Sequence, residues 1–139
     1  MVEKAIRQTI NTFIKELKKK KIKVAKVILF GSRASGRHRP DSDTDLAVLL
    51  DRSPSLAELA SLQEAMEGAI GKKGGIQFVV LNDLQSTTLG REIVRGGRVL
   101  FDSDGEQWPA FACRAMKAYA DFEPFRRLRR QVLQGGKVQ

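Results

Sequence analysis

Hydrophobic positions along the chain occur in two patterns, helical spacing and short continuous runs, and these patterns predict its elements. From the N-terminus to about Lys20 the apolar residues recur every three or four positions, which predicts an amphipathic helix. Two strands are predicted next, over 22–30 and 43–50. The second strand ends in a near-continuous apolar run, and such runs are typical of strands that are buried on both faces.

The rest of the chain is predicted from the same patterns together with its prolines and glycines. Pro54 is expected near the first position of a helix, where its missing N–H is tolerated, and Pro124 is expected to interrupt the last helix. The remaining predicted elements are a helix over 53–70, a strand over 76–81, a short helix over 82–97, an edge strand over 98–102 and a C-terminal helical segment over about 105–133.

This order of elements predicts an α/β fold of the α+β-like kind. We expect a single compact domain over residues 1–139, with a mixed β-sheet and helices packed mainly on one face. The composition, 42% hydrophobic and 29% charged, is that of a soluble globular protein. No apolar run approaches the roughly 20 residues needed to cross a bilayer, and the N-terminus has no signal-peptide core. We therefore expect a cytoplasmic protein without a membrane partner.

The net charge of +9 favours an anionic partner, such as a nucleotide, a nucleic acid or an acidic protein surface. One basic run, over 18–21, falls at the end of a predicted helix, where the helix dipole favours cations. A second basic cluster lies over 126–130. Neither run is interleaved with aromatic residues in the manner of a base-stacking platform, so RNA or DNA binding is compatible with the charge but is not required.

The most informative segment joins the first two predicted strands. It opens with Gly31 and Ser32 and closes, after ten intervening residues, with Asp43 and Asp45. Residues two apart on a strand point the same way, so the two aspartates are expected to share a face. Two close carboxylates repel each other unless a cation lies between them, and Mg²⁺ prefers such ligands together with substrate phosphates. Gly31 allows close backbone approach to a phosphate, Ser32 adds a hydroxyl, and Arg33 can balance the phosphate charge.

These residues resemble the DNA polymerase β-like nucleotidyltransferase superfamily, whose signature is Gly-Ser followed by Asp-x-Asp. The fuller pattern Gly-Ser-Arg-Ala-x-Gly, then Pro-Asp-Ser-Asp-x-Asp, is similar to the minimal nucleotidyltransferase (MNT) branch of that superfamily. The C-terminal pattern that contains Trp108, Phe111 and Tyr119 also resembles MNT antitoxins. The resemblance spans nearly the whole chain, and it is specific mainly over 29–50.

The resemblance implies the nucleotidyltransferase fold and an antitoxin that is paired with a HEPN-domain ribonuclease toxin in a hetero-oligomer. It also implies Mg²⁺-dependent transfer of AMP from ATP onto a toxin tyrosine, which neutralises the toxin. Asp43 and Asp45 are implied as catalytic residues and metal ligands. Gly31, Ser32 and Arg33 are implied to bind the nucleotide.

The resemblance further implies a third carboxylate on the next strand, but Gln77 occupies that position. Glutamine binds a metal weakly and cannot accept a proton from an acceptor hydroxyl. Asp83 is close in sequence, but it is expected beyond the strand, as the cap of the next helix. Two alternatives to AMP transfer onto a protein therefore stay open. One is an antitoxin that acts by binding alone, and the other is an RNA-directed nucleotidyltransferase, which only the charge favours.

Overall fold

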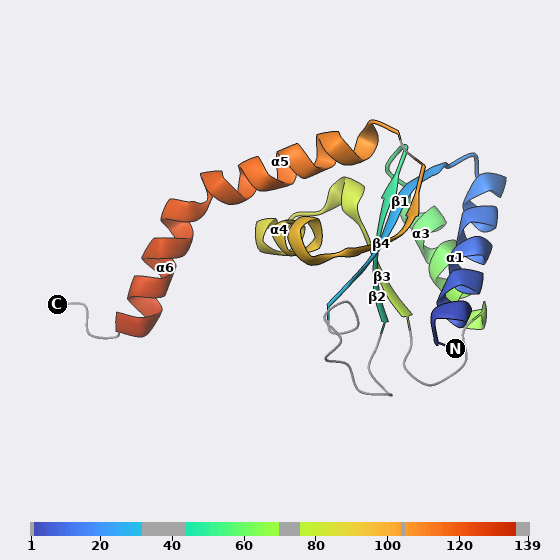
Figure 1. The fold of residues 1–139 in the computed structure, drawn as a ribbon, viewed down its shortest axis with the longest axis horizontal. Helices are drawn as coiled ribbons and strands as arrows, with labels where there is room; N and C mark the ends of the chain where they lie inside the picture. Colours follow the sequence, from blue (N-terminus) through green and yellow to red (C-terminus); the bar gives the residue numbers. More distant parts are fainter. Residues whose placement is uncertain (1, 32–43, 70–75, 104, 136–139) are drawn as a thin grey trace.

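A computed structural model describes residues 2–31, 44–69, 76–103 and 105–135, and Figure 1 shows the path of the chain. The elements appear in the predicted order. They are α1 (Val2–Lys19), β1 (Val24–Phe30), β2 (Thr44–Leu50), α3 (Leu56–Ala69), β3 (Ile76–Val80), a short 3₁₀ helix η1 (Leu81–Asp83), α4 (Thr87–Gly96), β4 (Arg98–Asp102), α5 (Gln107–Asp121) and α6 (Glu123–Gly135).

Four strands form a mixed sheet in the order β3-β2-β1-β4. β1 pairs antiparallel with β2 on one side and with β4 on the other, whereas β2 pairs parallel with β3. β1 and β2 are therefore the central strands, and all of their residues except Asp45 are buried. β4 lies at the edge of the sheet, as predicted.

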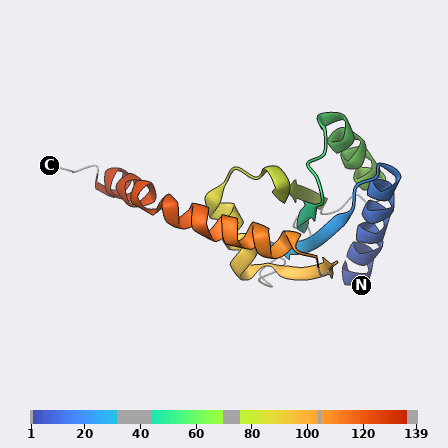
Figure 2. The same ribbon diagram turned by 90° about the horizontal axis from the view of Figure 1, so that it is seen from above.

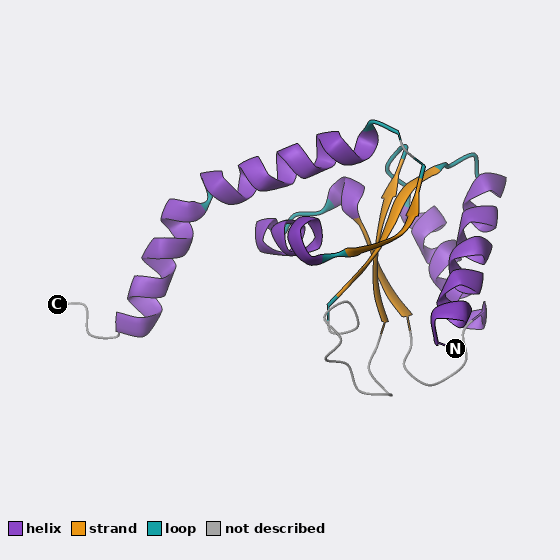
Figure 3. Cartoon of the chain, in the orientation of Figure 1, coloured by secondary structure: helices purple, strands orange, loops and turns teal. Residues whose placement is uncertain are grey.

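Helices cover both faces of this sheet (Figures 1 and 3). On one face, Leu17 of α1 and Leu62 of α3 belong to a core cluster with residues of β1 and β2. On the other face, Ile93 of α4 and Phe111 of α5 belong to a second cluster. The α+β fold class is confirmed, but the expectation that helices lie mainly on one face is wrong. The central strands are apolar on both sides, so both sides have to be covered.

The C-terminal segment consists of two helices that meet at Phe122. Pro124 is the second residue of α6, a position where its missing N–H is tolerated, so the predicted interruption is confirmed. α5 packs on the sheet through Trp108 and Phe111, whereas α6 extends away from it (Figures 1 and 2). None of the helices in the described ranges has the length and apolar character that crossing a membrane requires.

α3 begins at Leu56, two residues later than the position predicted from Pro54. The reason is a reciprocal cap at the start of this helix. The Ser55 hydroxyl accepts a hydrogen bond from the Glu58 N–H at 3.1 Å, and the Glu58 carboxylate accepts one from the Ser55 N–H at 2.9 Å. The sequence Ser-x-x-Glu carries this signal, and it outweighs the preference of proline for the first helical position.

α4 also begins later than predicted, at Thr87 rather than at Asn82. The Asn82 side chain is engaged elsewhere, because its amide accepts from the Leu50 N–H at 2.9 Å and donates to the Leu50 carbonyl at 2.7 Å. Ser86 caps the helix instead, and its hydroxyl accepts from the N–H of Leu89 at 3.1 Å.

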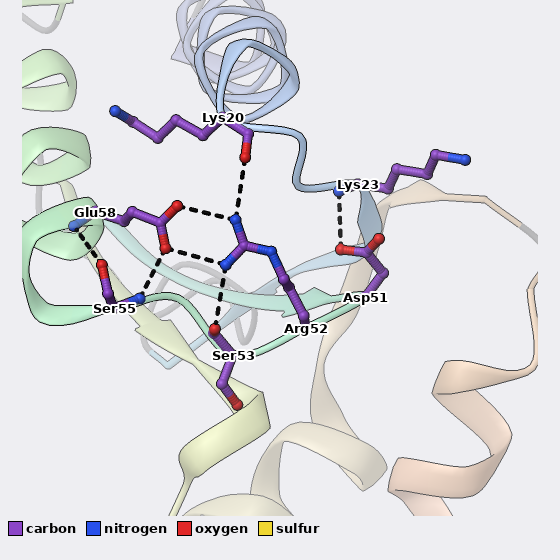
Figure 4. Close-up of polar contacts among 7 residues, drawn as sticks. All are labelled: Lys20, Lys23, Asp51, Arg52, Ser53, Ser55 and Glu58. Carbon is purple, nitrogen blue, oxygen red and sulfur yellow. Dashed lines mark hydrogen bonds and ion pairs between the residues drawn. The ribbon is translucent and has the colours of Figure 1, made fainter.

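A polar network around Arg52 joins the ends of three elements (Figure 4). Both terminal nitrogens of the Arg52 guanidinium donate to the Glu58 carboxylate, at 3.1 and 2.9 Å. One of them also donates to the Lys20 carbonyl, just after α1, at 3.1 Å. The network thus ties the segment after β2 to the start of α3 and the end of α1.

This network predicts a loss of stability in acid. The hydrogen bond from Arg52, followed by those from Ser55, lowers the pKa of Glu58 from 4.5 to about 2. A carboxylate whose pKa is lower in the folded state stabilises the fold above its unfolded pKa, and this contribution is lost as the pH falls from 4.5 to about 2. Urea unfolding measured across that range should show a steeper loss of stability for the wild type than for Glu58→Gln.

Glu64→Gln is the matched control for this measurement. Glu64 is an exposed glutamate of the same helix, and it forms no ion pair within the described ranges of the chain. Its acid profile should follow that of the wild type. A Glu58→Gln protein with the same acid profile would contradict the role assigned to the network.

Candidate active site

Strand pairing brings three residues singled out in the sequence to one end of the sheet. Phe30, the last residue of β1, pairs with Asp45 of β2, and Gly31 follows directly. Asp45 in turn pairs with Gln77 of β3 in the parallel register. Paired residues on neighbouring strands lie about 5 Å apart and point to the same face. Gly31, Asp45 and Gln77 therefore lie side by side across the three strands.

Gly31 lies in direct contact with the Asp45 carboxylate. Its φ of +78° is in the left-handed region, which glycine adopts without steric cost. A Cβ at this position would lie 2.6 Å from Oδ2 of Asp45, closer than two such atoms can approach. The turn after β1 therefore needs glycine for its backbone conformation and also for the space that the carboxylate occupies.

The Asp45 side chain points to the face of the sheet that α4 and α5 cover. Ala47 and Leu49 follow it at every second position of β2, and both belong to the core cluster that contains Phe111 of α5. Asp45 is partly buried, and Gln77 beside it is exposed. A partly buried carboxylate next to an apolar layer interacts more strongly with charge than one in bulk water.

The other predicted site residues, Ser32, Arg33 and Asp43, lie outside the described residues. Within the described ranges, no group of three or more His, Cys, Asp or Glu side chains gathers closely enough to hold a metal ion. The donors at this end nevertheless fit a hard cation, because Asp45 offers carboxylate oxygens and Gln77 of the paired strand offers an amide oxygen. Such a cation could also bind the phosphates of a nucleotide.

Asp83 lies far from this group. It belongs to η1, after the last residue of β3, whereas Gln77 lies near the first residue of that strand. Its carboxylate accepts a hydrogen bond from the Ser53 hydroxyl at 3.0 Å. The prediction that Asp83 caps α4 is wrong, because Ser86 is the cap of that helix. Asp83 therefore cannot replace Gln77 as a third carboxylate next to Asp45.

The structure also contains a cavity that was not predicted from the sequence. Its volume is about 200 Å³, and it lies between η1, α4 and α5, with Asn82, Ser86 and Arg114 among its lining residues. These residues follow β3 or belong to the helices beyond it, so the cavity is at the other end of that strand from Gln77. No motif in the sequence marks it, since its lining comes from two separate stretches of the chain, 81–90 and 111–118.

Comparison with known proteins identifies the family. Residues 11–106 match the family described as polymerase beta, nucleotidyltransferase. The matched range contains all four strands and therefore Gly31, Asp45 and Gln77. Among curated proteins, none matches this sequence.

Solved structures share the fold over nearly the whole chain. A toxin–antitoxin complex with AMP-PNP contains a chain with a TM-score of 0.73 and 21% identity, which covers 97% of this chain and 100% of that one. The toxin–antitoxin complex MntA–HepT contains a chain with a TM-score of 0.66 and 22% identity, covering 92% and 98% respectively. A complex of tri-AMPylated Shewanella oneidensis HEPN toxin with MNT antitoxin gives 0.65 and 19%, covering 96% of both chains.

At these identities the solved structures establish a common fold, and the family match establishes membership. That match covers more than half of the chain and includes the strands that bring Gly31, Asp45 and Gln77 together. We conclude that this chain belongs to the polymerase beta nucleotidyltransferase family.

Proposed function

We propose that this protein is an antitoxin-type nucleotidyltransferase that transfers AMP from ATP onto a tyrosine hydroxyl of a HEPN ribonuclease toxin and thereby neutralises it. The observation that carries the proposal is the contact of the Asp45 carboxylate with the backbone of Gly31 at the end of the sheet. Further support comes from two proteins of the same fold. One is part of a toxin–antitoxin complex with AMP-PNP, and the other belongs to a complex with a tri-AMPylated HEPN toxin.

The transfer requires the acceptor oxygen to attack the α-phosphorus of ATP in line with the leaving group. A bond forms between the acceptor oxygen and the α-phosphorus, the bond to the bridging oxygen breaks, and pyrophosphate leaves, while the hydroxyl proton passes to a base or to solvent. Asp45, together with Asp43 by prediction, would hold Mg²⁺, which when bound neutralises and orients the phosphates. Gly31 keeps the backbone open to phosphate oxygens, and Ser32 and Arg33 would bind the pyrophosphate.

A second candidate function is an antitoxin that acts by binding alone. The observation in its favour is Gln77, which pairs with Asp45 where the family resemblance implies a carboxylate. An amide cannot accept the proton of the acceptor hydroxyl, so transfer by this chain would be slow or absent. RNA-directed transfer, the third candidate, has only the net charge of +9 in its favour.

The proposed transfer can be measured with the purified protein, ATP labelled at the α-phosphate, and the product of the neighbouring gene, which the proposal takes to be the HEPN protein. With Mg²⁺ we expect label on the HEPN protein and an increase in its intact mass by one or more AMP groups. EDTA should abolish the reaction, because the carboxylates and the triphosphate repel each other without a cation. Asp45→Asn should abolish it as well, with an unchanged far-UV circular dichroism spectrum.

The distribution of label separates the three candidates. Label on added RNA instead of protein would favour RNA-directed transfer. A stable complex with the HEPN protein that gains no label at all would leave binding alone as the function.

Gly31→Ala should impair nucleotide binding. The left-handed backbone costs a residue with a side chain about 1–2 kcal/mol, and the added methyl group forces the Asp45 carboxylate out of its position. Misplacement by about 1 Å can reduce a rate by about 100-fold, so a loss of transfer of that order is expected. Calorimetric titration with Mg²⁺-ATP and a thermal melt measure the two effects.

Gly96→Ala is the matched control for this substitution. Gly96 is the last residue of α4, and a Cβ there would meet no atom within 4 Å. Nucleotide binding should therefore stay at the wild-type value, with unchanged or slightly increased stability. Wild-type nucleotide affinity in Gly31→Ala would show that the close contact with Asp45 has no part in binding.

Gln77→Asp should accelerate transfer. The new carboxylate would lie next to Asp45 and could accept the acceptor proton, and general-base catalysis contributes about 10²- to 10⁴-fold. Stability should fall slightly in the absence of metal, because the two neighbouring carboxylates repel each other. The measurement is single-turnover AMP transfer to the HEPN protein at saturating Mg²⁺.

Gln77→Asn shortens the side chain by the same amount without adding charge, and it serves as the control. Its transfer rate should not exceed that of the wild type. An unchanged or lower rate in a folded Gln77→Asp protein would mean that the third position does not limit the reaction.

A further inference from the structure

The last helix exposes an apolar surface that no part of the described chain covers. Phe125, Leu128 and Val132 are 68%, 58% and 57% exposed, and their spacing of three and four residues places them on one side of α6. Phe122 and Leu133, which are also exposed, extend this surface at its two ends. We call these five residues the α6 stripe. Clustered apolar side chains of this kind mark interaction sites, whereas single exposed ones are ordinary.

The opposite side of α6 is polar and internally paired. The Glu123 carboxylate lies 2.8 Å from Arg126, 3.5 Å from Arg130 and 3.9 Å from Arg127. These residues repeat at helical spacing on the side of the helix away from Leu128. α6 is therefore amphipathic, and its apolar side is the exposed one, where the Phe122 and Phe125 rings contact each other.

Arg126 fixes the rotation of α6 about its own axis. Its guanidinium carbon lies 3.4 Å from the centroid of the Tyr119 ring of α5, and the Arg91 guanidinium of α4 lies 4.7 Å from the same ring. Two of the Arg126 nitrogens, Nε and Nη1, are buried without a hydrogen-bond partner, as expected for a guanidinium stacked on an aromatic face. Because Arg126 is turned toward α5, the α6 stripe is turned away from the protein's own core.

A helix in this situation needs a partner for its stability. α6 has 13 residues, and isolated helices shorter than about 12–15 residues are marginal in water. Figures 1 and 2 show that α6 extends beyond the rest of the domain, with only its first turn close to α5. Apolar packing against another molecule would supply the stabilisation that tertiary contacts usually provide.

The charge of α6 indicates what kind of molecule would pack against its apolar side. The helix carries four arginines and one glutamate, which gives a net charge of +3. Arg129 lies one turn after Phe125, on the same side as the α6 stripe. Packing two copies of α6 against each other would place such like charges together, so self-association through this surface is disfavoured. An apolar surface bordered by acidic residues is complementary to it.

We propose that the α6 stripe is the docking surface for an apolar, acid-bordered surface of a protein partner. The identity of that partner rests on the proposed function, under which it is the HEPN toxin. α5, from which α6 extends, packs on the face of the sheet toward which the Asp45 side chain points. A partner held by α6 therefore approaches the catalytic face, where its acceptor hydroxyl is needed.

The test uses calorimetry to measure the affinity of the purified protein for the product of the neighbouring gene, taken under the proposed function to be the HEPN protein. The wild type is compared with two variants that add one negative charge each. Leu128→Glu places the charge in the α6 stripe. Gln134→Glu places it on the opposite, polar side, at an exposed position two turns after Arg127. Burial of a leucine side chain supports a loss of affinity of about 10- to 100-fold for Leu128→Glu and little change for Gln134→Glu.

Four further measurements complete the design. Circular dichroism checks that the helix content is unchanged, and titration with Mg²⁺-ATP checks the nucleotide site, which neither substitution touches. Sedimentation velocity of the isolated protein reports self-association, and a gel-shift assay with single-stranded RNA reports RNA binding.

Wild-type affinity of Leu128→Glu for the HEPN protein overturns the proposal. So does a result in which the substitution changes only self-association or RNA binding, or one in which the wild type does not bind the HEPN protein. Selective loss of partner binding supports the proposal, even if no AMP transfer is detected. The affinity measurement tests the docking surface, and AMP transfer tests the proposed chemistry, so one can fail without the other. Transfer that persists while Leu128→Glu binds normally would leave the proposed function standing without this docking surface.

Discussion

The pairing register of β1, β2 and β3 is the constraint on which the rest of the structure depends. It places Gly31, Asp45 and Gln77 beside one another, and it is fixed by the core rather than by the site. Along β2, Leu46 and its alternate neighbours face α1 and α3, whereas Ala47 and its alternate neighbours face α4 and α5. A slip by one residue would turn every side chain to the other face and drive the aspartate into an apolar layer.

Lys26 is the one polar residue of the buried strand β1, and its contacts anchor the start of the C-terminal helical segment. Lys26 is almost fully buried, and its ammonium group lies 3.3 Å from the Asp102 carboxylate of β4 and 4.5 Å from the centroid of the Trp108 ring of α5. A buried ammonium group is tolerated only with such partners, so the three elements are held to one another. The start of α5 is thereby fixed over the face of the sheet toward which Asp45 points.

The strands and their order along the chain could be predicted because each is a short, largely apolar run with glycine or aspartate next to at least one of its ends. The placement of Gln77 was implied by the family resemblance, which expects a carboxylate at that position of the next strand, and the structure pairs Gln77 with Asp45. The distribution of helices on the two faces could not, because it depends on topology and not on any local pattern. The starts of α3 and α4 differ from the prediction because Ser55 and Ser86 cap these helices, whereas the prediction relied on Pro54 and Asn82. For α3 the Ser-x-x-Glu pattern signals the cap, and for α4 the competing residue Asn82 bonds to Leu50 instead.

The bend between α5 and α6 means that a small rotation there displaces the far end of α6. With a rise of about 1.5 Å per residue, its 13 residues extend about 20 Å from Phe122. A rotation of about 10° at this bend would move the far end by about 3 Å, and the stack of Arg126 on Tyr119 is what limits that rotation. In-line attack at phosphorus is sensitive to a misplacement of the reacting groups by only about 1 Å. Under the proposed function, the alignment of a partner docked on α6 would therefore depend on the Tyr119 ring, which lies at the junction of the two helices and not beside Gly31 and Asp45.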